Sequence, residues 1–336
     1  MSKYDVAIIG GGPAGVFAAY ELAEKKPELR ILVLESGRDI YTRTCPISTG
    51  KVKSCIGCKP CSIMRGFGGA GAFSDGKYNF TTKFGGWLNE YLSDSEVMDL
   101  IKYVDKINMK HGAPAQVFST KDSNIGQLAL QHDLHLLSAS VRHLGTENNL
   151  QMLKATYEYL KDKVEFRFEC PVTHIHSDGQ GHNSIELESG ETIDAEYLIA
   201  APGRAGAEWF SKECEQLGLD LTNNQVDVGV RVEVPDEVWN HITSQVYEAK
   251  LVYRTKRYGD QVRTFCMNPH GHVVMENTDG IVTVNGHSYE DPAMHTENTN
   301  FALLVAKHFS EPFKDSNGYG ESIARLSNTL GGGVIV

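Results

Sequence analysis

The chain has 336 residues, of which 41 % are hydrophobic and 22 % charged, and its formal net charge at neutral pH is −11. This length can bury a large core and suffices for two domains. The acidic balance argues against a nucleic-acid partner, and no apolar run reaches the roughly 18 residues of a membrane span. No signal peptide precedes the first apolar run, so we expect a cytoplasmic protein whose seven cysteines are not structural disulfides.

The first 35 residues predict a dinucleotide-binding strand–turn–helix–strand unit. An apolar strand over Tyr4–Ile9 precedes a glycine turn at 10–15 and a helix to about Glu24, and a second strand over Ile31–Leu34 ends at Glu35. The glycines permit a sharp turn and close approach of a pyrophosphate to the helix N-terminus. The terminal carboxylate accepts hydrogen bonds from a ribose and repels a 2′-phosphate, so we expect FAD or NAD rather than NADP. The alternative is a glycine turn that binds no nucleotide.

The middle of the chain predicts loops, helices and a second strand cluster. Residues 42–84 lack periodicity and are expected to be long functional loops. Helices are expected at 95–109 and 149–161, and a strand-like segment at 134–144. Short strands are expected at 164–168, 172–175, 184–187 and 192–193, with a hairpin turn at Ser189 and Gly190.

A second strand-to-glycine turn follows this cluster. The apolar run 197–200 leads into Ala201-Pro202-Gly203-Arg204 and a helix over 206–217. A later strand and turn that return beside the N-terminal unit are more typical of FAD folds than of simple NAD dehydrogenases.

The last third predicts a mainly antiparallel substrate or cap domain, because strand segments alternate with turns. The expected strands are 228–234, 246–253, 263–267, 272–275 and 281–284. Residues 331–336 resemble a glycine loop that enters a buried strand, so we expect the chain to be a fragment of a longer protein.

The segment Gly66-Phe67-Gly68-Gly69-Ala70-Gly71 also matches the dinucleotide pattern. No strand precedes it and no amphipathic helix follows, so we interpret it as backbone lying close to a phosphate or flavin oxygen. A merely structural loop is the alternative. Lys77 is either a positive charge near the cofactor or a solvated lysine.

Four cysteines lie just before this glycine segment. Cys55, Cys58 and Cys61 are spaced by two residues, and Cys45 lies ten residues upstream. This spacing suits an iron–sulfur cluster or zinc, a redox-active dithiol, or no bound species. Cys170, Cys214 and Cys266 are expected to be ordinary free cysteines.

No catalytic residue stands out. His174 and His176 share a strand face but lack a third ligand, and His270 or His287 is a candidate acid or base only because imidazole titrates near neutrality. We therefore leave the catalytic residues unassigned.

Several segments together resemble the largely uncharacterised FAD-dependent dehydrogenases of bacteria and archaea, within the two-dinucleotide-binding flavoproteins. The similar segments are 6–15, 66–77, 264–269, 284–289 and 298–305. The resemblance implies an α/β fold: a glutathione-reductase-like FAD domain with a Rossmann-like core, assembled from separated segments, and an inserted antiparallel domain. The Gly-Asp element and helix that close the flavin site in such proteins are not found before residue 336.

The expected organisation is an FAD domain over 1–90 and 134–217 with a helical insertion at 91–133. A substrate or cap domain covers 218–325, and residues 326–336 begin a returning FAD segment. The expected FAD contacts are Gly10, Gly12, Pro13, Ala14, Gly15, Glu35, Ser36, Gly68, Gly69, Ala70, Ser74, Val172, Ala201 and Gly203.

The expected function is hydride or electron transfer between FAD and an unidentified small-molecule substrate or electron carrier. The flavin supplies the redox chemistry, and the protein binds and orients the flavin and the substrate. The alternatives are an iron–sulfur flavoprotein that uses Cys45, Cys55, Cys58 and Cys61, and an FAD-binding protein without catalysis.

Overall fold

The computed structural model describes residues 4–309 and 315–332. The chain divides into two compact units, each built from segments that are far apart in the sequence. The first contains residues 1–73, 153–222 and 276–281, and the second contains 74–152, 223–275 and 282–336. Within the described residues, no helix combines the length and apolar character that crossing a membrane demands.

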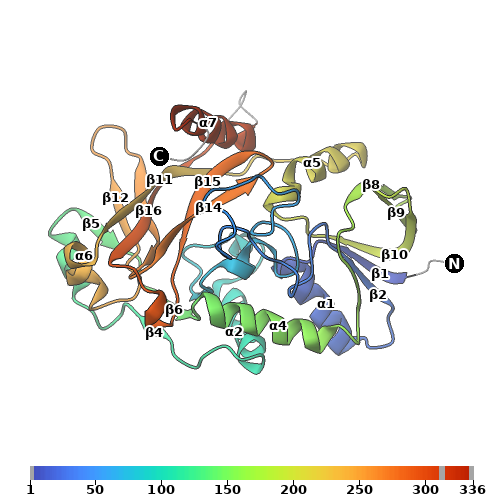
Figure 1. Cartoon of the computed structure of the whole chain (residues 1–336), viewed down its shortest axis with the longest axis horizontal. Helices are drawn as coiled ribbons and strands as arrows, with labels where there is room; N and C mark the ends of the chain where they lie inside the picture. The colour runs from blue at the N-terminus through green and yellow to red at the C-terminus, as the bar shows by residue number, and fades with distance from the viewer. Residues whose placement is uncertain (1–3, 310–314, 333–336) are drawn as a thin grey trace. The chain divides into compact units, whose positions relative to one another are not determined.

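The first unit contains a six-stranded sheet, in the order β7-β2-β1-β10-β9-β8. Figure 1 labels its strands β1, β2, β8, β9 and β10. The first four strands in this order are parallel, and the β10–β9 and β9–β8 pairs are antiparallel. The strands are β1 (Tyr4–Ile9), β2 (Ile31–Leu34), β7 (Glu165–Arg167), β8 (Val172–Ser177), β9 (Asn183–Leu187) and β10 (Thr192–Ala200). This order brings the carboxyl ends of β1, β2 and β10 to one edge, where ligands bind in open α/β sheets.

Helix α1 (Pro13–Lys25) follows the turn after β1, and helix α5 (Ala207–Gln216) follows the short 3-10 helix Arg204–Gly206 after β10. Ile8, Leu32 and Val33 are fully buried, as expected for parallel strands covered on both faces. The predicted strands at the N-terminus are confirmed, and α1 ends one residue beyond the prediction. The prediction of separate strands at 192–193 and 197–200 is wrong, because β10 runs without a break past the charged Asp194 and Glu196.

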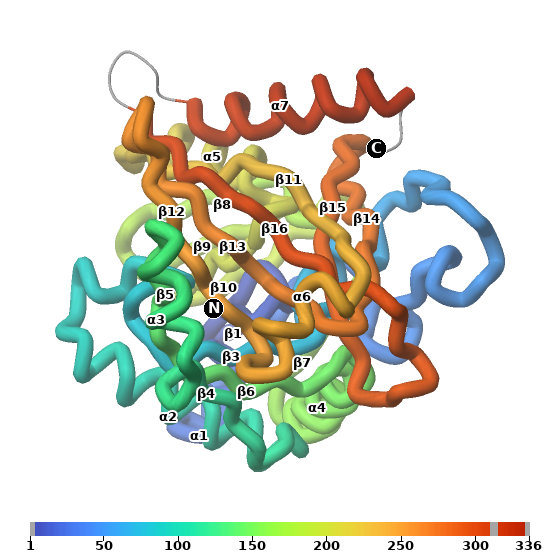
Figure 2. The backbone as a smooth tube through the Cα atoms, turned by 90° about the vertical axis from the view of Figure 1, so that its left-hand side faces the viewer, coloured from blue at the N-terminus to red at the C-terminus, as the bar shows by residue number. Residues whose placement is uncertain are grey.

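The second unit contains a five-stranded antiparallel sheet, in the order β11-β16-β13-β12-β5. Figure 2 shows β12, β13, β16 and β11 side by side. The strands are β5 (Leu134–Leu136), β11 (Val226–Pro235), β12 (Leu251–Arg254), β13 (Gln261–Asn268) and β16 (Asn298–Lys307). Met267 and Phe301 pack with α3 (Ile125–Leu130) and α6 (Asp236–Thr243) in its core.

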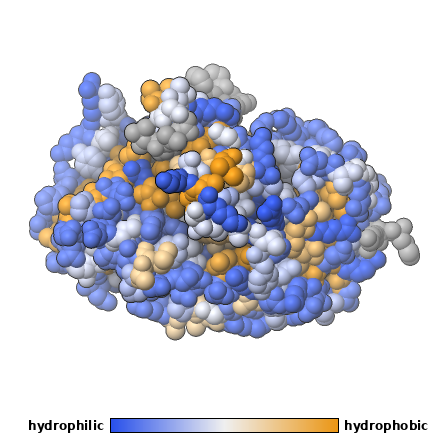
Figure 3. Space-filling model, in the orientation of Figure 1, coloured by the Kyte–Doolittle hydropathy of each residue, from blue (hydrophilic) through white to orange (hydrophobic). Residues whose placement is uncertain are grey.

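Smaller sheets and helices complete this unit. β3 (Lys77–Phe80), β6 (Ser140–His143) and β4 (Phe118–Ser119) form a three-stranded sheet, and β14 (His272–Thr278) and β15 (Ile281–His287) form a hairpin whose tip belongs to the first unit. The helices are α2 (Asp94–Lys110), α4 (Thr146–Leu160), which continues into the first unit, and α7 (Ser316–Leu330). Val230 and Leu326 are 62 % and 60 % exposed, and Figure 3 shows hydrophobic surface in the region of β11 and β16.

Three predictions here are wrong in their bounds. The expected loop 42–84 contains β3, the segment 134–144 is broken into β5 and β6, and only the last residues of 246–253 form strand β12. Buried Val246 and Ala249 explain the apolar pattern that suggested a longer strand, because they pack into the core from irregular backbone. Residues 333–336 of the expected returning segment lie outside the described residues, and residues 326–330 belong to α7.

Candidate functional site

A pocket of about 800 Å³ lies in the first unit at the carboxyl ends of β1, β2 and β10. The turn after β1, the residues after β2, the glycine loop before β3 and the turn after β10 all contribute to its walls. Ten of the expected FAD contacts line it: Gly10, Gly12, Pro13, Glu35, Ser36, Gly69, Ala70, Val172, Ala201 and Gly203.

Two glycines of the first turn are required by the protein itself. A Cβ on Gly15 would lie 1.9 Å from the carbonyl oxygen of Gly10, so only glycine lets α1 pack this closely on β1. A Cβ on Gly10, whose φ is +103°, would lie 2.2 Å from the carbonyl oxygen of Ala201. Gly15 thus permits the close packing of α1 on β1, and Gly10 permits the close approach of the turns after β1 and β10.

Gly12 is different, because nothing in the protein demands a glycine there. It is the N-cap of α1 with ordinary extended backbone, and its nearest neighbour to an added Cβ is the Cα of Gly69 at 3.8 Å. No side chain caps this helix start, and the first-turn N–H groups of a helix have no intrahelical acceptor. Gly12 therefore leaves space in the pocket beside the N-terminus of α1, where the helix dipole attracts an anion.

Glu35 is buried and ties three loops together. Its Oε2 accepts a hydrogen bond from Gly11 N at 2.7 Å, and its Oε1 accepts bonds from Gly37 N at 2.7 Å and Gly66 N at 3.0 Å. A carboxylate oxygen can accept more than one hydrogen bond, so the side chain can hold the loops and still accept from a ligand hydroxyl.

Arg43 fixes the glycine loop 66–71 and the residues before it through hydrogen bonds to backbone carbonyl oxygens. It is 3 % exposed, and its guanidinium donates to the carbonyl oxygens of Ser62, Ile63 and Phe67 at 2.6–2.8 Å. Burial lowers the pKa of Arg43 to about 10, although the carboxylate of Glu35 favours its charged form. Gly68 N in turn donates to Gly11 O at 2.8 Å, which joins this loop to the first turn.

The far end of the pocket is lined by Val172 and Trp209. Trp209 lies on α5 and donates its indole N–H to the carbonyl oxygen of Thr173 at 2.8 Å, which fixes α5 against β8. Buried Glu213 strengthens the same contact, because it accepts from Ile175 N at 2.7 Å. The wall beside β8 is therefore rigid and partly aromatic.

The family model described as DAO, FAD dependent oxidoreductase, matches residues 5–311. The chain belongs to this family. It is an FAD-dependent oxidoreductase with a mixed α/β FAD-binding fold and an additional antiparallel region. A comparison with curated proteins finds no match.

Among solved structures, the chain is similar to NikD, an amino acid oxidase essential for nikkomycin biosynthesis, with 13 % identity and a TM-score of 0.45 over 91 % of this chain and 71 % of that one. It is also similar to glycine oxidase from Geobacillus kaustophilus, with 15 % identity and a TM-score of 0.44 over 94 % of this chain and 88 % of that one. No residue role is carried over from either.

Four of the expected FAD contacts do not line the 800 Å³ pocket. Ala14, Gly15 and Gly68 lie in the segments that form it, whereas Ser74 belongs to the second unit, where its carbonyl oxygen accepts from Asn149 Nδ2 at 2.9 Å. Sequence reasoning missed Met64, Arg65 and Trp209, which do line the pocket. Only Trp209 carried a signal, since it lies on the helix predicted after the second glycine turn.

The structure does not bring the cysteines together as a metal site. Over residues 4–309 and 315–332, no three side chains of His, Cys, Asp or Glu are placed to hold a metal ion. Cys45, Cys55, Cys58 and Cys61 are free, and Cys55 is exposed, with its sulfur 3.7 Å from Asn277 Nδ2. The iron–sulfur and zinc interpretations therefore receive no support from the geometry.

Lys77 is not a solvated lysine. Its side chain is 8 % exposed, and Nζ lies 3.3 Å from Asp75 Oδ2 and 2.8 Å from Asn268 Oδ1. The nearby carboxylates hold the pKa of Lys77 well above its usual range despite its burial. Its charge is thus compensated inside the second unit.

Proposed function

We propose that the pocket of the first unit holds FAD with the diphosphate against the N-terminus of α1. The support is Gly12: the protein itself leaves space for a Cβ at this pocket position, yet the residue is a glycine, so the space is available to a ligand. Gly69 and Ala70 would lie across the diphosphate, because both line the pocket and Gly69 packs against the first turn. Gly69 N already donates to Gly66 O at 2.8 Å, so the donors that a phosphate needs come from the uncapped first turn of α1.

The adenosine end of FAD would lie between β2 and β8. Glu35 accepts hydrogen bonds from the ribose hydroxyls, and Val172 and Trp209 contact the adenine. This arrangement also disfavours a ribose 2′-phosphate, because Glu35 carries a negative charge at the end of β2. FAD supplies the two-electron acceptor when bound, and these residues bind and orient it.

The reaction we propose is hydride transfer between the flavin and a small-molecule substrate in a cytoplasmic protein, as in the uncharacterised FAD-dependent dehydrogenases that the sequence resembles. The domain boundaries of the sequence analysis remain a prediction, with the substrate bound by the antiparallel region. No side chain is assigned to the chemical step.

The test is a binding experiment on the purified chain. Absorption between 350 and 500 nm, before and after addition of FAD, is measured for the wild-type protein and for Gly12→Ala. We expect flavin bands in the wild type and at least a tenfold weaker affinity in the variant, whose circular dichroism stays native because the added Cβ has space. Gly86→Ala is the control, since its Cβ would meet nothing within 4 Å and it does not line the pocket. A wild type that binds no FAD, or a Gly12→Ala that binds it equally well, overturns the proposal.

A further inference from the structure

A buried cluster of charged and hydroxyl side chains lies in the second unit, outside the FAD pocket. It surrounds His143, whose side chain is 1 % exposed at the end of β6. The other members are Asp75, Lys77, Tyr247, Glu248, Lys250, Ser288 and Glu290. Nothing in the FAD site uses these groups.

His143 connects the surface with the interior through its two ring nitrogens. Nδ1 lies 3.0 Å from Glu290 Oε1, and the Glu290 side chain is 51 % exposed. On the other side, Nε2 lies 2.7 Å from Tyr247 Oη and 3.1 Å from Ser288 Oγ. Asp75 Oδ2 also lies 3.3 Å from Nε2. An imidazole with hydrogen-bond partners on both nitrogens can take up a proton at one and release a proton from the other.

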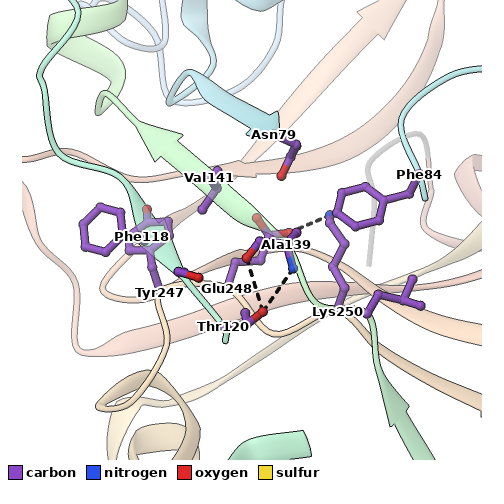
Figure 4. Close-up of a pocket in the computed structure, with 11 residues that line it drawn as sticks. Asn79, Phe84, Phe118, Thr120, Ala139, Val141, Tyr247, Glu248 and Lys250 are labelled. Carbon is purple, nitrogen blue, oxygen red and sulfur yellow. Dashed lines mark hydrogen bonds and ion pairs between the residues drawn. The ribbon is translucent and has the colours of Figure 1, made fainter. Parts of the chain in front are cut away.

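The inner side continues as a chain of hydrogen bonds. Tyr247 Oη lies 2.7 Å from Ser288 Oγ, and Ser288 Oγ lies 3.3 Å from Asp75 Oδ2. Tyr247 also lines a small pocket of about 20 Å³, together with Phe118 and Glu248 (Figure 4). This volume is large enough for one water molecule.

The charges around His143 balance only when it is protonated. Asp75, Glu248 and Glu290 are acidic, and Lys77 and Lys250 are basic, so a neutral His143 leaves one negative charge in excess. Burial lowers the pKa of His143, but the hydrogen bonds that the ring donates to the carboxylates of Asp75 and Glu290 raise it, and the net shift is upward. Lys77 also lowers the pKa of His143, and the two carboxylates outweigh this effect. Glu147 accepts hydrogen bonds from the backbone N–H groups of Glu290 and Asp291.

We propose that Glu290, His143 and Tyr247 form a proton relay between solvent and the small pocket lined by Tyr247 and Glu248. When His143 is neutral with its proton on Nε2, a proton that enters at Glu290 binds Nδ1, the Nε2 proton moves to Tyr247 Oη, and the hydroxyl proton of Tyr247 passes to a water in the small pocket. One proton enters and one leaves, and no electrons move. The existence of the relay is independent of FAD, whereas its use in exchanging the proton that accompanies hydride transfer rests on the proposed function.

The experiment measures how fast the ring N–H protons of His143 exchange with water. The chain is labelled with ¹⁵N-histidine, the His143 signals are assigned by their loss in His143→Gln, and exchange is followed by saturation transfer from water at pH 6. We expect exchange at least tenfold faster than that of the backbone amides of Val141 and Arg142 on the same strand. Glu290→Gln should slow it at least tenfold, whereas Glu297→Gln, an exposed acid of the same loop region, should leave it unchanged.

A merely structural cluster gives a different result. The His143 N–H protons would then exchange only when β6 opens, at the rate of the neighbouring amides and with no effect of Glu290→Gln. That outcome overturns the relay. FAD binding is measured on the same variants and is expected to stay at the wild-type level, so a failure of the FAD proposal would be seen separately.

Discussion

At the scale of single residues, Glu35 shows how a functional position can also be structural. Its carboxylate accepts hydrogen bonds from the backbone N–H groups of Gly11, Gly37 and Gly66, which belong to separate loops around the pocket. A ligand hydroxyl would add to these bonds rather than replace them. Substitution of Glu35 therefore changes stability as well as affinity, and the two effects must be measured separately.

We expect Glu35→Gln to lower the free energy of unfolding by about 2–3 kcal/mol, because the amide group turns a donor toward buried backbone donors. Urea unfolding followed by circular dichroism measures this loss. Glu188→Gln is the matched control, since Glu188 lines the same pocket but is exposed, and its effect should stay within about 0.5 kcal/mol. Equal stabilities of Glu35→Gln and the wild type would show that the three bonds contribute nothing.

His143 gives a prediction for pH. Its pKa in the folded chain is raised above the ordinary 6.5, so the stability that it contributes is fully present below pH 6.5 and is lost as the pH rises through the raised value. The difference in unfolding free energy between wild type and His143→Gln should therefore shrink as the pH is raised above 6.5. Urea unfolding of both proteins from pH 5.5 to pH 9 measures it, and a difference that grows with pH contradicts the assignment.

At the scale of elements, the sequence predicted the first unit better than the second unit. The pattern over Tyr4–Ile9 and Ile31–Leu34 is unambiguous because both strands are apolar apart from Asp5 and a glycine turn lies between them. Helix α6 and strand β16 were not predicted. Strand β16 is buried between β11 and β13, where Asn298 and Asn300 interrupt the apolar pattern.

The site shows the same limit. Glycines and a terminal acid are recognisable in the sequence because each has a fixed spacing from a strand. Arg43 is not, because it acts through contacts with carbonyl oxygens that only the folded chain brings close. His143 and Glu290 meet across 147 residues, which no local pattern indicates.

The packing of α1 on β1 makes a second glycine testable. In Gly15→Ala, the Cβ would lie 1.9 Å from Gly10 O, so the helix must shift away from the sheet. We expect a loss of about 3 kcal/mol in the free energy of unfolding. Thermal unfolding measures it beside Gly12→Ala, which should remain within about 1 kcal/mol of the wild type because its Cβ has space. Similar losses in both variants would mean that α1 does not pack as described.

At the scale of the whole molecule, the two proposals concern different units, with FAD binding in the first and the His143 relay in the second. The first unit contains every residue that lines the 800 Å³ pocket, and the second contains every member of the His143 cluster. Ligand binding and proton exchange can thus be changed independently. This separation predicts where a bound dinucleotide will protect the backbone.

Hydrogen exchange of the backbone amides, with and without FAD, tests that separation. A ligand that binds only the folded state at a hundred times its dissociation constant stabilises it by about 2.7 kcal/mol. We expect slower exchange in β1, α1 and β10 of the first unit, and little local change in β6 or β13 of the second. NADP⁺ at the same concentration should protect far less, because Glu35 opposes its 2′-phosphate. Equal protection by NADP⁺ would show that Glu35 does not discriminate against a 2′-phosphate. Protection confined to the second unit would show that FAD does not bind in the pocket of the first unit.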